Sequence, residues 1–159
     1  METYSDMKEA PSAERLELAA LEASGEYVFH GSGDDLIALE PRQAIDTKKG
    51  PDGPPAVFAS NKADYAIFMA IVNKENCPHG SRSRAGARSG VLSFGMTPET
   101  AKQLTDEAGG YVYVFDKAQF TPRERGGVEY VSYERVEPVR KIRVGKRDLP
   151  DNITLFEGE

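Results

Sequence analysis

Several short strand patterns follow one another in the second half of the chain, and this feature constrains the fold most. YVYVFD, residues 111–116, is the strongest of them, because Tyr and Val dominate it and glycines precede it. VEYVSY, VRKIRV and ITLF follow, with Pro138, Gly145 and Pro150 as breaks. A doubly wound parallel sheet would require a helix between successive strands, but no helical pattern lies between these runs. The pattern therefore favours an α+β fold.

The first half contributes a helix and the first strand. SAERLELAALEASG, residues 12–25, predicts a short helix with Ser12 as its N-cap and Gly25 as its stop. EYVFH, residues 26–30, predicts a strand that ends at the glycines after it. Three leucines of the helix are expected to be buried: Leu16, Leu18 and Leu21.

A strand, a turn and a second helix follow in the middle of the chain. Residues 56–60 predict an apolar strand, and Asn61 is the expected N-cap of a helix over residues 62–72. A third helix, with Thr97 as N-cap, is expected to run to residue 108. The whole pattern predicts about six or seven strands with two or three helices. The second helix has apolar residues at helical spacing: Ala63, Ile67, Phe68 and Ile71.

Two segments predict loops. Residues 41–55 are crowded with Pro and Gly, and residues 73–90 form the longest stretch without a regular pattern. The second loop carries three arginines among small residues. Further basic residues precede Glu129 or lie near the end of the chain. The basic residues are Arg82, Arg84, Arg88, Arg123, Arg125, Arg140, Lys141, Arg143, Lys146 and Arg147.

Composition excludes several classes of protein. The chain has 159 residues, of which 39% are hydrophobic and 29% charged, as expected for one globular domain and not for a disordered chain. Twenty basic against 26 acidic residues give a net charge of −6, which argues against a surface that grips polyanions everywhere. No apolar stretch approaches the roughly 18 residues of a membrane span, and the N-terminus lacks a secretory signal pattern. We therefore expect a cytoplasmic protein with no membrane partner.

Nucleotide and metal fingerprints are missing. The sequence has neither a GxxxxGK phosphate loop nor a GxGxxG motif at a helix start. Cys77 is the only cysteine, and it lies too close to His79 for the usual zinc-finger spacing. A Cys–His nucleophilic pair would lack a visible third group to orient it. We expect no metal site.

Three segments carry polar or aromatic residues at or beside predicted strands. They are YVFHGSG with His30, AVFASNKADYA with Tyr65, and VEYVSY with Glu129. Taken singly, each residue also fits a structural role at a turn, in the core or on the surface. Their order along the chain resembles the ADP-ribosyltransferases of the diphtheria-toxin and poly(ADP-ribose) polymerase type. The family's motifs are an HG[ST] at a strand end, an [IV]YFA strand followed by a tyrosine-bearing helix, and a late EY[IV]xY strand.

This resemblance, over residues 26–144, implies a split, strand-rich domain that holds NAD between two sheets. In such a domain His30 would bind the adenosine ribose, while Gly31 and Ser32 would hold the nicotinamide carboxamide. Tyr65 would stack on the nicotinamide ring. Glu129 would stabilise the positive charge that develops on the ribose as nicotinamide leaves, as expected for an oxocarbenium-like transition state.

One position departs from the family pattern. Val57 stands where the family has a tyrosine, so the ring contact would pass to Phe58 or Tyr65. By the resemblance we expect residues 1–25 to form an N-terminal polar segment and helix, and residues 26–159 a single ADP-ribosyltransferase-like catalytic domain.

The expected activity is NAD-dependent mono-ADP-ribosylation of RNA, DNA or protein. Small members of this family resemble toxins of toxin–antitoxin or phage-defence systems, so an antitoxin is an expected partner. Two alternatives remain open: RNA 2′-phosphate removal or NAD hydrolysis on the same fold, and a binding or inhibitor module that has lost catalysis. The arginines of residues 82–88 and 123–125 either form a solvated charged surface, as the net charge slightly favours, or attract a nucleic-acid backbone or the NAD pyrophosphate if their loops flank the cleft.

Overall fold

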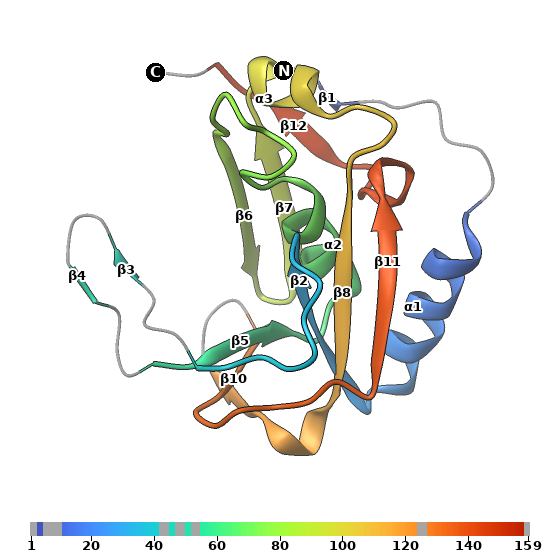
Figure 1. The fold of residues 1–159 in the computed structure, drawn as a ribbon, viewed down its shortest axis with the longest axis vertical. Helices are drawn as coiled ribbons and strands as arrows, with labels where there is room; N and C mark the ends of the chain where they lie inside the picture. The colour runs from blue at the N-terminus through green and yellow to red at the C-terminus, as the bar shows by residue number, and fades with distance from the viewer. Residues whose placement is uncertain are drawn as a thin grey trace.

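The computed structural model describes most of the chain, namely residues 3–4, 11–41, 45–46, 50–51, 55–123 and 127–157. It is an α+β fold built from two main sheets (Figure 1). The expected fold class is therefore confirmed. The residues that follow Pro41 in the predicted loop include a short β3–β4 pair, Ile45–Asp46 with Gly50–Pro51. The rest of that loop, and most of the first ten residues, lie outside the described residues.

The larger sheet has six strands, and every neighbouring pair in it is antiparallel. It holds the strands that carry the predicted site residues. One of its two edge strands is β9, which pairs with the strand that begins at Glu129. The order across the sheet is β11 (Arg140–Gly145), β8 (Gly109–Asp116), β2 (Tyr27–Ser32), β5 (Val57–Ser60), β10 (Glu129–Ser132) and β9 (Thr121–Arg123).

The smaller sheet has four strands, in which β12 runs parallel to β7 and the other pairs are antiparallel. Its order is β1 (Thr3–Tyr4), β12 (Ile153–Leu155), β7 (Val91–Met96) and β6 (Ser83–Arg88). Phe68 of helix α2 (Ala63–Ile71) packs on Phe94 of β7 with ring centroids 4.9 Å apart. Helix α2 therefore lies between the two sheets, as Figure 1 shows.

Alternation along β8 explains why this strand is buried on both faces. Val112 and Val114 enter the main core together with α2, whereas Tyr113 and Phe115 enter a second core on the other face of the sheet. Side chains of successive strand residues point to opposite faces, so the run of Tyr and Val supplies both cores at once. The sequence prediction of a strand over residues 111–116 is confirmed, and the strand begins two residues earlier, at Gly109.

Helix α1 (Ala13–Ser24) packs against β11 and α2 and has the expected ends. Ser12 Oγ accepts from the Arg15 amide, and Gly25 ends the helix with φ +74°. Leu18 is buried and Leu21 packs against the core, but Leu16 is 59% exposed, so its expected burial is wrong. Leu16 lies two residues before Leu18, which places it on the opposite face of the helix.

Three further expectations are corrected by tertiary contacts. Asn61 is not the N-cap of α2: the cap position is Lys62, which makes no side-chain cap bond. The expected loop over 73–90 contains β6, because pairing with β7 along six residues overrides weak strand propensity. The third helix, α3 (Pro98–Gln103), keeps its Thr97 cap but ends well before residue 108.

Two short 3₁₀ turns complete the described fold, η1 (Lys117–Gln119) and η2 (Lys146–Asp148). In the part of the chain that the structure describes, no helix has the length and apolar character needed to cross a membrane.

Candidate functional site

A cavity of about 500 Å³ opens between the two sheets beside α2. Its walls come from β2, β5 and β10 of the six-stranded sheet, from α2, and from β6 of the smaller sheet. Five of the six predicted site residues line this cavity. They are His30, Gly31, Phe58, Tyr65 and Glu129.

Strand pairing brings these distant residues together. Strand β5 lies between β2 and β10: Ser60 is the register partner of Phe29 on one side and of Glu129 on the other. A residue early in the chain and one late in the chain therefore meet across a single intervening strand. The sixth predicted residue, Ser32, lies two positions further along β2 and does not line this cavity.

His30 is held by the neighbouring strand. Its Nδ1 lies 2.6 Å from the carbonyl oxygen of Phe58. A carbonyl oxygen only accepts, so Nδ1 carries the proton and donates. This hydrogen bond holds the imidazole in one orientation, with His30 lining the cavity.

Gly31 permits a very close approach of helix and strand. A Cβ atom at this position would lie 1.8 Å from the carbonyl oxygen of Ala66 in α2. Gly110 of β8 faces the same helix, where a Cβ would lie 2.1 Å from the Ala70 carbonyl oxygen. The resemblance gave Gly31 a contact with the nicotinamide carboxamide but no packing reason for the empty space beside its Cα atom. In the structure that space is taken by α2, so packing by itself requires glycine at this position.

Tyr65 stands in the first turn of α2 and is half-buried. Burial raises the pKa of its hydroxyl, and the negative charge of Glu129 raises it further. The phenol and the carboxylate therefore interact across the cavity. The Tyr65 ring also lies 6.5 Å from that of Phe94, which supports it from the side of the smaller sheet.

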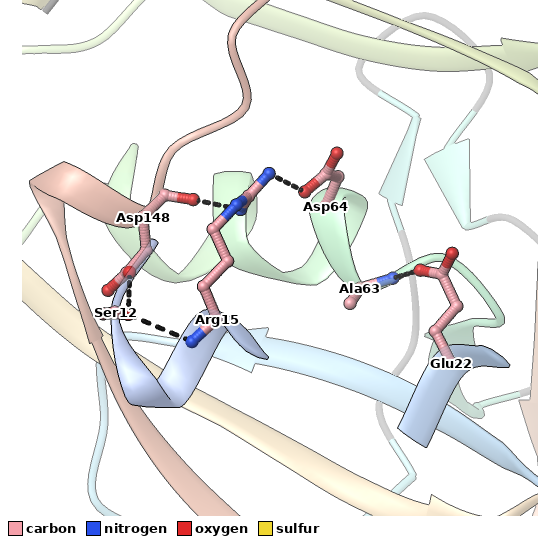
Figure 2. Close-up of polar contacts among 6 residues, drawn as sticks. All are labelled: Ser12, Arg15, Glu22, Ala63, Asp64 and Asp148. Carbon is pink, nitrogen blue, oxygen red and sulfur yellow. Dashed lines mark hydrogen bonds and ion pairs between the residues drawn. The ribbon is translucent and has the colours of Figure 1, made fainter. Parts of the chain in front are cut away.

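Helix α1 holds the start of α2 through two polar contacts (Figure 2). Glu22 Oε1 accepts from the Ala63 amide at 2.6 Å and so supplies the N-terminal cap that Lys62 does not. Arg15 donates to Asp64 Oδ1 at 2.9 Å, next to Tyr65. The cap that the sequence assigned to Asn61 thus comes from another helix. The side-chain oxygen of Asn61 is buried and has no hydrogen-bond partner among the residues described.

The same network anchors α1 to the far end of the chain. Arg15 also donates to the Asp148 carbonyl at 2.6 Å, and Ser12 Oγ donates to Asp148 Oδ1 at 2.6 Å. The other carboxylate oxygen of Asp148 accepts from the Gly145 amide at 2.9 Å. Asp148 is buried, and these donors satisfy its charge. As Figure 2 shows, Arg15 spans the gap between Asp148 and Asp64.

Glu129 begins β10, lines the cavity and has a side chain that is 24% exposed. Its register partner on β9 is Arg123, whose Nη1 lies 3.7 Å from Glu129 Oε1. The Arg123 guanidinium carbon also lies 5.5 Å from the centroid of the Phe58 ring. From the sequence, Arg123 belongs either to a solvated basic surface or to a phosphate-attracting loop, and no sequence pattern pairs it with Glu129.

Ser32 lies in a second hollow of about 300 Å³, which shares His30 and Phe58 with the first cavity. Its Oγ accepts from the Asp34 amide at 3.0 Å, which stabilises the turn after β2. Val57 also lines this second hollow and belongs to the second core. Phe58, which borders both hollows, is therefore the aromatic residue that β5 offers to a ligand.

The opposite wall comes from a segment that the sequence did not identify. Gly86 and Ala87 of β6 line the cavity, and so do Met69 of α2 and Val128 before β10. Small residues on β6 leave the space open, but the sequence had predicted a loop there. Among the described residues, no group of three or more His, Cys, Asp or Glu side chains is placed to hold a metal ion.

Comparison with known proteins yields no match: no family model, no curated protein and no solved structure is significantly similar to this chain.

Proposed function

We propose that this protein is an NAD-dependent mono-ADP-ribosyltransferase that transfers ADP-ribose to a macromolecular acceptor and releases nicotinamide. The observation that carries the proposal is the shared cavity. Residues from three separate motifs, at positions 30, 58, 65 and 129, line one space although they are distant in the sequence. The cavity also adjoins a second hollow at His30 and Phe58, which provides room for a long dinucleotide.

The chemistry required of these residues matches their placement. Cleavage of the bond between ribose and nicotinamide leaves the bonding electrons on nicotinamide, and positive charge develops on the ribose. Glu129 would stabilise this charge with its carboxylate, and the acceptor would form the new bond to the ribose and lose a proton. Phe58 and Tyr65 would offer aromatic faces to the cationic nicotinamide ring. His30 would orient the adenosine ribose at the junction of the two hollows.

The test is nicotinamide release by Glu129→Gln, which keeps the shape of the side chain and removes its charge. We expect a loss of about a hundredfold or more, the size found for removal of one preorganised electrostatic group. Glu17→Gln is the matched control, because Glu17 pairs with Arg140 at the opposite edge of the sheet. Equal activity of Glu129→Gln and the unaltered protein would overturn the proposal.

Labelled NAD and a cell extract, followed by separate nuclease and protease digestion, identify the acceptor polymer. Free ADP-ribose as the product would instead indicate NAD hydrolysis, and a phosphate-bearing ADP-ribose would indicate RNA 2′-phosphate removal. Calorimetry that shows no binding at millimolar NAD would favour the non-catalytic module. An antitoxin partner, a defence role and the cytoplasmic location stay predictions, as does the division of the chain at residue 25.

A further inference from the structure

Arg123 occupies a special position at the edge of the candidate site. It ends β9, the outermost strand of the six-stranded sheet, directly opposite Glu129. Both side chains are only about a quarter exposed, at 26% and 24%. A cation at this place sits beside the one carboxylate that the proposed reaction needs in its charged form.

The contact between these two groups is loose. Arg123 Nη1 lies 3.7 Å from Glu129 Oε1, which is close enough for an ion pair but longer than a normal hydrogen bond. In the described ranges, the Arg123 guanidinium makes no hydrogen bond, although it has five N–H donors. The planar fork of arginine fits a phosphate as well as it fits a carboxylate. Arg123 is therefore placed to exchange one anion for another.

A second arginine follows the cavity lining of β6 in the sequence. Arg88 is exposed at the end of β6, next to Ala87 of the cavity wall. The hairpin turn after it reaches the segment that leads to Glu129, because a Cβ on Gly127 would lie 3.5 Å from the Gly90 nitrogen. Both arginines therefore belong to strands that line the cavity or pair with its lining, although the chain as a whole has a net charge of −6.

We propose that Arg123 is the phosphate-binding residue of this site and that a substrate phosphate competes with Glu129 for it. In the empty protein Arg123 pairs with Glu129. When a phosphate-bearing substrate enters, the guanidinium turns to the phosphate, and the carboxylate becomes available to the ribose. The identity of the substrates rests on the proposed function. The phosphate belongs either to the dinucleotide or to a nucleic-acid acceptor.

Direct binding tests this competition without any catalytic turnover. The probes are ADP, followed by calorimetry, and a short fluorescently labelled single-stranded RNA, followed by anisotropy. Arg123→Gln should raise the Kd by about tenfold or more, since a charge-assisted hydrogen bond is lost. Glu129→Gln should lower the Kd by about twofold to fivefold, because the competing ion pair disappears. Arg123→Lys should bind with intermediate affinity.

The matched control is the ion pair at the opposite edge of the same sheet. Arg140 Nε lies 2.6 Å from Glu17 Oε2 on α1, remote from the cavity lining. Arg140→Gln and Glu17→Gln remove the same charges and should leave both Kd values unchanged. All variants should retain the melting temperature within a few degrees, because ion pairs that solvent reaches contribute little to stability.

The two probes distinguish the source of the phosphate. If Arg123→Gln weakens and Glu129→Gln tightens the binding of ADP, the phosphate belongs to the dinucleotide. If the two variants change the binding of RNA alone in this way, the phosphate belongs to the acceptor. The proposal is wrong if Arg123→Gln weakens neither probe, if Glu129→Gln does not tighten binding, or if Arg140→Gln has the same effect. Failure of the proposed function is seen separately, as absence of nicotinamide release by a protein that still shows the binding pattern.

Discussion

The wall of the cavity formed by β2 and α2 is packed backbone against backbone, whereas the wall formed by β10 carries Glu129, which makes one loose ion pair with Arg123 on the neighbouring strand β9. In the first wall, the Gly31 backbone touches the Ala66 carbonyl so closely that no side chain fits between them. In the second wall, Glu129 and Arg123 are each about a quarter exposed and 3.7 Å apart.

Because the two walls differ in packing, they suit different tasks. Tyr65 sits on an element whose first turn is fixed by two contacts from α1, so its ring has a defined place. A rigid surface of this kind suits the recognition of a flat ligand, because little side-chain freedom is lost on binding. Glu129 instead sits where a small side-chain movement changes its partner. Under the proposed function, the site would combine a rigid binding wall with a wall whose charged side chain can change its partner.

Gly31→Ala tests the packed wall and should have the largest effect on stability. The new methyl group would meet backbone atoms of α2, which cannot move alone, so we expect a loss of at least about 3 kcal/mol. Urea unfolding measures it. Gly86→Ala on β6 is the control: its Cβ has only one neighbour, Ser93 Oγ at 3.8 Å, and the change should stay below about 1 kcal/mol. Equal stability of the two variants would show that α2 does not press on β2.

Ser12→Ala tests the polar network that holds α1 in place. It removes the N-cap bond to the Arg15 amide and the buried bond to Asp148, so we expect a loss of about 2 kcal/mol. Ser24→Ala at the other end of the helix removes two exposed bonds, one donated to the Leu21 carbonyl and one accepted from the Glu26 amide, and should cost much less. If both variants unfold at the same urea concentration, the bonds of Ser12 stabilise the protein no more than the exposed bonds of Ser24.

Titration of Tyr65 tests whether the two walls face each other across one cavity. The expected change in the pKa of Tyr65 is the smallest of the predicted effects. Burial is the larger cause of the raised pKa, and the Glu129 charge adds to it. Glu129→Gln should therefore lower the pKa of Tyr65 but leave it above the ordinary value for tyrosine. NMR of ¹³C-labelled tyrosine against pH measures the change. Glu17→Gln should not alter the pKa of Tyr65. If Glu129→Gln also leaves this pKa unchanged, Tyr65 and Glu129 do not face each other across one cavity.

Local sequence patterns were sufficient for most of the secondary structure. Ser12 and Gly25 cap α1 as expected, Thr97 and Pro98 begin α3, and Tyr and Val residues form β8. Each of these features depends on residues within a few positions of one another. The order of the three motifs also indicated which residues to seek in one cavity, although the motifs alone could not show that they meet.

Tertiary contacts decided the rest, because they join residues far apart in the sequence. Asp148 bonds to Ser12 across 136 positions, and Glu22 caps a helix that begins 41 residues later. No local pattern encodes such partners. The same holds for β6, whose small residues form a cavity wall only because β7 pairs with it.

The amino-acid sequence by itself determined the strand-rich α+β class, the helix caps and the candidate residues, since these follow from backbone preference and short-range hydrogen bonds. Only the tertiary structure decided that His30 and Glu129 share a cavity while Ser32 lies in the next one, and that Arg123 stands beside Glu129. The physical reason is strand pairing: Phe29 and Glu129 are both register partners of Ser60, and Arg123 is the partner of Glu129, and these pairings form between segments that are distant in the sequence.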